Sequence, residues 1–158
     1  MKYDFGFIQG RMTAPPSKNI LQYFPQNNWQ KEFYYAQKYN FDFIEYFGER
    51  KFNFRNPIWS QKGLNSINKC VKKNNLLNYS FCDDYFIGNS ILESESLNQY
   101  YKKLIDSLLK INVSIYILAL FEKSQITNQN YKNFVKILKK ISTLLSKKKN
   151  YISTRNKY

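Results

Sequence analysis

Histidine is absent from the sequence. It is the commonest general base near neutral pH, a frequent metal ligand, and the base of Ser-His and Cys-His triads. Its absence excludes those sites and leaves carboxylates, lysines and hydroxyls as the groups for any chemistry. The two cysteines, Cys70 and Cys82, lack C-x-x-C spacing and fall in different predicted elements, so we expect two reduced, partly buried thiols.

Glycine and proline are scarce, with 5 and 4 residues among 158, which excludes collagen-like and loop-dominated chains. Long hydrophobic runs are missing too. None approaches the ~18 to 20 residues of a membrane span, so we expect no membrane partner. The chain passes from Met1 directly into strand-like residues without the basic and apolar regions of a secretory signal, and we therefore expect a cytoplasmic protein.

Acidic residues are missing from the last part of the chain, because none follows Glu122. The net charge is +14, and residues 128–158 carry much of the excess. Clustered cations can bind nucleic acid through its phosphates. Charge runs at one end of a chain are more typical of solvated helix faces. We therefore predict a basic C-terminal tail at residues 147–158 and keep a basic nucleic-acid binder only as a third, less favoured function.

The hydrophobic residues, which make up 43% of the chain, follow a repeat of one strand and one helix, and 18% of all residues are aromatic. Strand-prone segments start near Phe5, Phe41, Leu77 and Val113, each 36 residues after the one before. Apolar residues between them follow helical spacing. We predict parallel strands at residues 4–9, 41–46, 77–83 and 113–120, in sequential order and each followed by a helix.

Polar residues mark the predicted helix ends. Asn28 and Ser60 precede the first and second helices, where their side chains can cap the helix. An asparagine, which tolerates left-handed backbone geometry, stands between each of the first three helices and the next strand: Asn40, Asn75 and Asn112.

Two α/β architectures fit this repeat. One is an incomplete (β/α)8 TIM barrel with four parallel units and the start of a fifth strand near residues 151–153. Eight units would need about 288 residues. The other is a complete, four-stranded, doubly wound sheet. No strand-helix turn carries a G-x-G-x-x-G or P-loop motif, so neither a dinucleotide nor a P-loop phosphate site is supported.

Polar side chains follow the predicted strands, at the end where parallel barrels carry their chemistry. Gln9-Gly10-Arg11 follows the first strand, the second is expected to end at Glu45, the third at Asp83-Asp84, and Glu122-Lys123 follows the fourth. Carboxylates at three successive strand ends can bind sugar hydroxyls, hold a divalent metal or move a proton. Equally, strands commonly end in polar residues at the solvent boundary.

Several short segments follow one another along the chain at regular spacing. They are Gly6-Phe7-Ile8-Gln9-Gly10-Arg11-Met12, Phe24-Pro25, Asn28-Trp29, Glu32-Phe33, Phe41-Asp42-Phe43-Ile44-Glu45, Asn56-Pro57-Ile58-Trp59-Ser60, Cys82-Asp83-Asp84-Tyr85-Phe86 and the strand from Ile117 to Glu122. In this order they resemble the xylose isomerase-like barrels, specifically the sugar phosphate isomerase/epimerase group. The resemblance covers about residues 4 to 146, which we take as a partial barrel domain, 1–146.

The resemblance implies metal-assisted proton transfer on a sugar or sugar phosphate, with a divalent ion such as Mn, Mg, Co or Zn. That family typically holds its metal with carboxylates and a histidine from the fifth to eighth strands, which this sequence lacks. Residues 150–158, where a fifth strand would deliver its glutamate, look like the end of a truncated copy. We therefore expect no cofactor in this chain and no assigned catalytic residue. The expected substrate contacts are Gln9, Arg11, Glu45, Asp84 and Glu122.

Two classes of function remain open. The first is an isomerase or epimerase that is inactive alone. The second is a non-catalytic scaffold that binds a sugar, another subunit or nothing. A barrel with four units leaves its first and fourth strands as exposed edges, and the fourth is apolar from Ile115 to Leu120. We therefore predict self-association through those edges.

Overall fold

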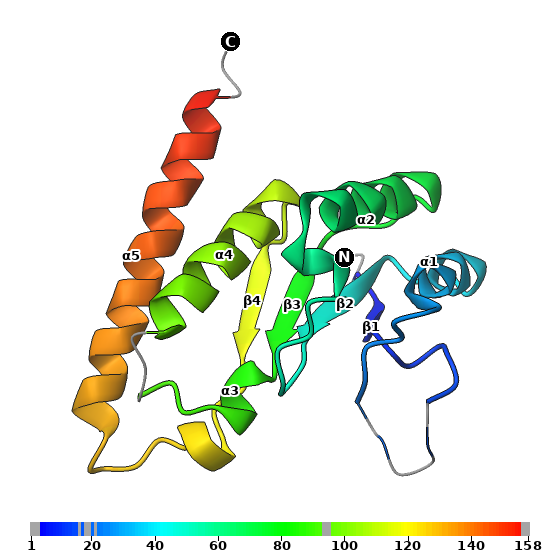
Figure 1. Cartoon of the computed structure of the whole chain (residues 1–158). Coiled ribbons are helices and arrows are strands. Elements are labelled where there is room, and N and C mark those ends of the chain that lie inside the picture. The colour runs from blue at the N-terminus through cyan, green and yellow to red at the C-terminus, as the bar shows by residue number, and fades with distance from the viewer. Residues whose placement is uncertain (1–3, 16, 18–19, 21, 93–95, 156–158) are drawn as a thin grey trace.

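The fold is α/β, with one four-stranded parallel sheet in the order β1-β2-β3-β4 (Figure 1). The computed structural model describes residues 4–15, 17, 20, 22–92 and 96–155, of which 96–98 and 147–155 by their backbone alone. The strands are β1 (Gly6–Ile8), β2 (Phe43–Gly48), β3 (Ser80–Asp83) and β4 (Ile115–Leu118). The predicted parallel, sequential order is confirmed. The doubly wound alternative was wrong, because that arrangement reverses the strand order.

A long helix follows each strand, as the 36-residue repeat predicts. These helices are α1 (Trp29–Lys38), α2 (Gln61–Lys73), α4 (Ser96–Lys110) and α5 (Tyr131–Arg155). Three short elements that the sequence analysis missed lie in the loops, namely the 3-10 helices η1 (Pro57–Trp59) and η2 (Glu122–Ser124) and the single-turn helix α3 (Tyr85–Gly88). No helix in the described part of the chain is both long and apolar enough to cross a membrane.

The four long helices pack on one face of the sheet. The strand register pairs Tyr46 with Phe81 and Phe81 with Tyr116, so these side chains share a face. Side chains of α1, α2 and α4 pack with Tyr46 and Phe81 in the main core, and α5 packs against Tyr116 in a second cluster. The helix residues buried there are Phe33, Ala36, Leu64, Ile67, Leu104, Leu108, Phe134 and Ile141.

The opposite face of the sheet is more open. Register places Ser80 beside Ile115 and Cys82 beside Ile117 on this face. Ile115 and Ile117 are each 40% exposed. An apolar run such as that of β4 is typical of a strand covered on both faces, whereas the long helices cover only one face of β4.

The helix ends follow the predicted chemistry at most positions. Asn40, Asn75 and Asn112 adopt left-handed φ values of 60°, 52° and 56°. In each case the next residue donates its amide hydrogen to a carbonyl five residues back, the hydrogen bond that closes a Schellman motif. Ser60 Oγ caps α2 by accepting from the Gly63 amide at 3.0 Å. Asn28 occupies the N-cap of α1, without a side-chain cap hydrogen bond.

Two predicted boundaries were wrong. β2 continues to Gly48, so Glu45 lies within the strand instead of at its end. The expected start of a fifth strand near residues 151–153 is helical, because α5 runs to Arg155. The reason lies in the sequence, since no glycine or proline follows Gly88 to stop a helix.

Candidate functional site

The candidate site begins with Glu45 and Ser80 on the open face of the sheet. Glu45 lies in β2 beside Ile8 of β1, and Ser80 opens β3. Ser80 Oγ donates a hydrogen bond of 2.7 Å to Glu45 Oε2. The bond fixes the carboxylate in position, and a carboxylate oxygen can accept further hydrogen bonds from a ligand.

Cys82 lies between two carboxylates on the same face. Its Sγ donates to Asp84 Oδ1 at 3.7 Å. Burial raises the pKa of the Cys82 thiol to about 12, and the negative charges of Asp84 and Glu45 contribute to that rise. The thiol therefore stays protonated at neutral pH and is a poor nucleophile. Both carboxylates are close enough to act on it, so the structure brings together Glu45 and Asp84, two of the predicted contacts.

A third predicted contact, Glu122, forms an ion pair with Arg50, which in turn acts on Asp84. Arg50 Nη1 and Nη2 donate to the two carboxylate oxygens of Glu122 at 3.1 and 3.0 Å. Both side chains are about half exposed, at 53% and 51%. Burial raises the pKa of Asp84, and the positive charge of Arg50 partly opposes that rise. Arg50 thus links the β2, β3 and β4 ends electrostatically.

Glu122 sits in an unusual backbone conformation. Its φ is +51°, in the left-handed region that residues with a Cβ rarely adopt. Such a conformation costs of order 1–2 kcal/mol and persists only where surrounding contacts hold it. The paired hydrogen bonds from Arg50 are one such contact.

Gln9 is buried at the end of β1, in a loop that a buried glutamate organises. Gln9 is 3% exposed, and its amide donates to the Glu45 carbonyl at 2.9 Å. Glu32 of α1 is fully buried and accepts from the Gly10 and Met12 amides at 2.9 and 3.2 Å. Thr13 Oγ1 also donates to it, at 3.2 Å. Burial raises the pKa of Glu32 more than these bonds lower it.

Arg11 extends from the same loop and is exposed. Its Nη2 donates to Gln22 Oε1 at 3.1 Å, within the connection between β1 and α1. Its place beside Glu45 and Asp84 stays a prediction. Arg50, Ser80 and Glu32 contact the predicted residues Glu122 and Glu45 or the loop that holds Gln9, and they were missed as site residues. Arg50 comes shortly after the observed end of β2. Because the sequence analysis placed that end at Glu45, it did not identify Arg50 as a residue that follows a strand.

The site does not fit the divalent metal of the resembling family. Among the side chains that the structure describes, no group of three or more Cys, Asp or Glu residues is arranged to hold a metal ion. Glu45 and Asp84 instead accept hydrogen bonds from Ser80 and Cys82. We therefore derive no chemical step through a metal.

Asp83 lies on the helix-covered face, unlike its neighbour Asp84. It is fully buried and accepts hydrogen bonds from Tyr100 Oη at 2.9 Å, Tyr116 Oη at 2.7 Å and the Tyr85 amide at 3.1 Å. Burial raises the pKa of Asp83 to about 6, although the three hydrogen bonds oppose the rise. Asp83 therefore joins β3, α3, α4 and β4.

Asp83 predicts a dependence of stability on pH. Its pKa of about 6 exceeds the ordinary value of 3.8, so the folded state binds more protons than the unfolded state between those values. The free energy of unfolding should thus fall as pH rises through this range, with Asp83 contributing about 3 kcal/mol. Asp83→Asn should remove this contribution, which urea unfolding at about pH 4 and pH 7 measures.

The control for this prediction is Asp4→Asn, because Asp4 is exposed. This control should keep the pH dependence of the original chain. Equal slopes of stability against pH in Asp83→Asn and the original chain would contradict the prediction.

Comparison with known proteins does not assign the chain to a family. No family model matches the sequence, and no curated protein matches it significantly. The functional argument therefore rests on the fold and on four residues that lie within or after β2, β3 and β4, namely Glu45, Arg50, Asp84 and Glu122. They provide three carboxylates and one arginine, and the contacts of Glu45 with Ser80 and of Asp84 with Cys82 lie on or beside the open face of the sheet.

Proposed function

We propose that the chain forms four units of a xylose isomerase-like barrel and binds a sugar or sugar phosphate at the carboxyl ends of its strands. Two features of the fold support the barrel. The strands run in sequential order, and the long helices pack on one face of the sheet. A barrel has both properties, whereas a doubly wound sheet has helices on both faces.

The grouping of Glu45 and Asp84 around Cys82 carries the proposal about the ligand. Sugar hydroxyls are good hydrogen-bond donors, and ionised carboxylates accept hydrogen bonds more strongly than neutral groups do. Both carboxylates lie on or beside the open face, and Ser80 adds a hydroxyl that donates to Glu45. These three residues are the proposed contacts to the sugar.

Arg50 is the proposed contact to a phosphate. Its guanidinium already makes a two-bond contact with the Glu122 carboxylate, a geometry that suits phosphate equally well. The pair is about half exposed, so a ligand can reach it. A sugar phosphate would exchange the carboxylate of Glu122 for its own phosphate on Arg50.

We propose binding without turnover. Moving a proton between adjacent carbons of a sugar requires a base and a group that stabilises the developing oxyanion. The described carboxylates do not fit the metal that supplies this stabilisation in the resembling family. The alternative, a scaffold without a sugar ligand, shares the fold and differs only in the outcome of a binding measurement.

Calorimetric titration with aldose and ketose phosphates tests the proposal. We expect saturable binding that Glu45→Gln and Asp84→Asn each weaken by about tenfold, because each removes a charged acceptor. Asp4→Asn is the control, since Asp4 is exposed and precedes β1, at the opposite end of the strands. It should bind as tightly as the original chain.

Two results would contradict the proposal. No binding to any of these sugars would favour the scaffold. Turnover that requires added Mn²⁺, Mg²⁺ or Co²⁺ and disappears in Glu45→Gln would establish the chain as an active isomerase or epimerase and overturn binding without turnover.

A further inference from the structure

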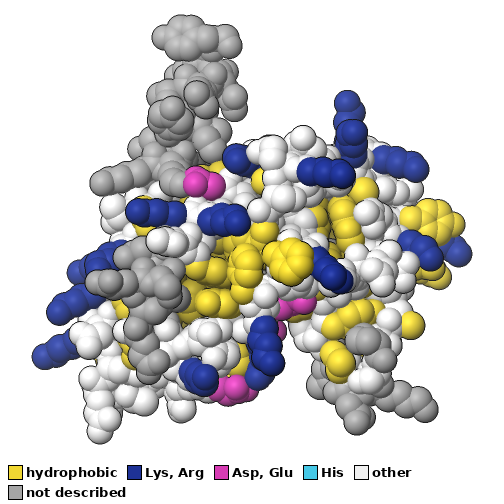
Figure 2. Space-filling view, in the orientation of Figure 1, with side chains coloured by type: hydrophobic (Ala, Val, Ile, Leu, Met, Phe, Trp, Pro, Cys, Tyr) yellow, Lys and Arg dark blue, Asp and Glu magenta, His cyan; other side chains and the backbone are white. Residues whose placement is uncertain are grey.

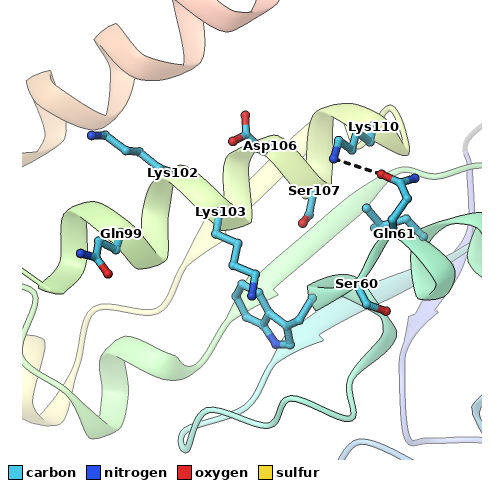
Figure 3. Close-up of a pocket in the computed structure, with 10 residues that line it drawn as sticks. Ser60, Gln61, Gln99, Lys102, Lys103, Asp106, Ser107 and Lys110 are labelled. Carbon is cyan, nitrogen blue, oxygen red and sulfur yellow. Dashed lines mark hydrogen bonds between the residues drawn. The ribbon is translucent and has the colours of Figure 1, made fainter.

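We propose a second site, a groove on the helix-covered side of the sheet that binds the phosphate group of a small organic molecule. It lies between α2 and α4, next to η1, and has a volume of about 410 Å³ (Figure 3). The proposed sugar site is on the opposite face, so this inference does not depend on it. The residues lining the groove are Trp59, Ser60, Gln61, Leu64, Gln99, Lys102, Lys103, Asp106, Ser107 and Lys110.

A largely buried serine offers its hydroxyl to the groove. Ser107 of α4 is only 6% exposed and lines the groove. Figure 3 shows its side chain directed from α4 toward η1 and Ser60. Its Oγ has no hydrogen-bond partner among the described residues, and it is not one of the fully buried atoms in that condition, so it keeps contact with the solvent in the groove. Such a hydroxyl can exchange a water molecule for a hydrogen bond to a ligand.

Two lysine ammonium groups face the same space. Lys110 Nζ donates to Gln61 Oε1 at 3.1 Å, across the groove from α4 to α2. Lys103 Nζ lies 5.9 Å from the centre of the Trp59 ring. Neither ammonium lies within 4.0 Å of a carboxylate among the described side chains. Asp106 also lines the groove, but in Figure 3 its carboxylate points from α4 away from Ser60.

The amino end of α2 adds to the positive potential. Gln61 is the first residue of α2, and the first amides of a helix have no acceptor within the helix. The helix dipole also favours an anion there. A phosphate in the groove would accept hydrogen bonds from Ser107, Lys103 and Lys110 together. The ring of Trp59 and the side chain of Leu64 offer an apolar wall for the organic part of the ligand.

The wider surface explains why the test needs a control lysine. Figure 2 shows Lys and Arg side chains spread over the helices, around an apolar central region, with few acidic side chains between them. A chain with a net charge of +14 attracts anions without specificity. Lys38 of α1 is a matched control, because its Nζ also lies over an aromatic ring, 5.6 Å from the centre of Tyr39.

Titration of the ¹⁵N-labelled full chain with inorganic phosphate, in about 0.15 M salt, tests the site, since distant charges are largely screened there. We expect saturable shifts at the Ser60, Gln61, Leu64 and Ser107 amides. Lys103→Gln should weaken binding about tenfold and Ser107→Ala about threefold, whereas Lys103→Arg and Lys38→Gln should preserve it. Phenyl phosphate should bind more tightly than inorganic phosphate, because its ring can pack on the apolar wall.

Several outcomes would overturn the proposal. Equal weakening by Lys103→Gln and Lys38→Gln would mean attraction to the net charge alone. Phosphate shifts confined to Arg50, Glu45 and Asp84 would place the anion at the proposed sugar site instead. Equal affinity for phenyl phosphate and inorganic phosphate would contradict the proposal that the ligand has an organic part.

Discussion

Replacing Glu32 by alanine should lower the free energy of unfolding by about 3 kcal/mol, a large part of the stability of a typical domain. The fully buried carboxylate accepts hydrogen bonds from the Gly10 and Met12 amides and from Thr13. Truncation leaves these donors without an acceptor and opens a cavity at the amino end of α1. The connection from β1 to α1 should then lose its fixed conformation.

Urea unfolding, followed by circular dichroism, measures the loss. Glu32→Gln should fall between alanine and the original chain, because an amide keeps an acceptor oxygen while losing the charge. Gln30→Ala is the matched control, since Gln30 is an exposed neighbour on α1. It should change stability by less than about 0.5 kcal/mol. A loss below about 1 kcal/mol in Glu32→Ala would contradict the role assigned to Glu32.

The second large effect concerns association between copies of the chain. β1 and β4 are the outer strands of the described sheet, and Ile115 and Ile117 of β4 are each 40% exposed on its open face. Unpaired strand edges with apolar side chains pair readily with another chain. We propose that two copies pair through these edges about a two-fold axis and together enclose a barrel.

Sedimentation velocity at about 0.15 M salt should give twice the mass of one chain at micromolar concentration, because charge repulsion beyond ~8 Å is largely screened. Ile117→Lys should shift the equilibrium toward monomer by at least about tenfold, since it buries a charge in the interface. Phe54→Lys adds the same charge at a side chain that is 73% exposed and lies in the loop after the central strand β2. This control should leave association unchanged. A stable monomer of the original chain would contradict the prediction.

The sequence was most informative where local chemistry and periodicity agree. Repeats of apolar residues predicted the order of strands and helices, and the positions of Asn40, Asn75 and Asn112 predicted three helix ends with left-handed geometry. Both signals depend on neighbours within a few residues. The end of α5 could not be predicted in this way, because Ile152 also fits the helical spacing that continues from Ile141 and Leu145.

The candidate site was less predictable, because its contacts join distant parts of the chain. Glu45 and Asp84 were identified from their places near strand ends, but the role of Ser80 depends on the register between β2 and β3. Arg50 and Glu122 are 72 residues apart in sequence. Glu32 fits equally well as an ordinary acidic residue in the first turn of a helix, and its contact with Gly10 appears only in the fold.

The sequential strand order also affects how the chain can fold. Each strand of the described sheet pairs with the strand of the adjacent unit, so the chain segment closed by each pairing is one strand, its helix and their loops. Closing a short segment costs less entropy than closing a long one, and local pairing speeds folding. During synthesis each new unit can therefore dock on the one completed just before it, so the growing sheet carries a single advancing edge.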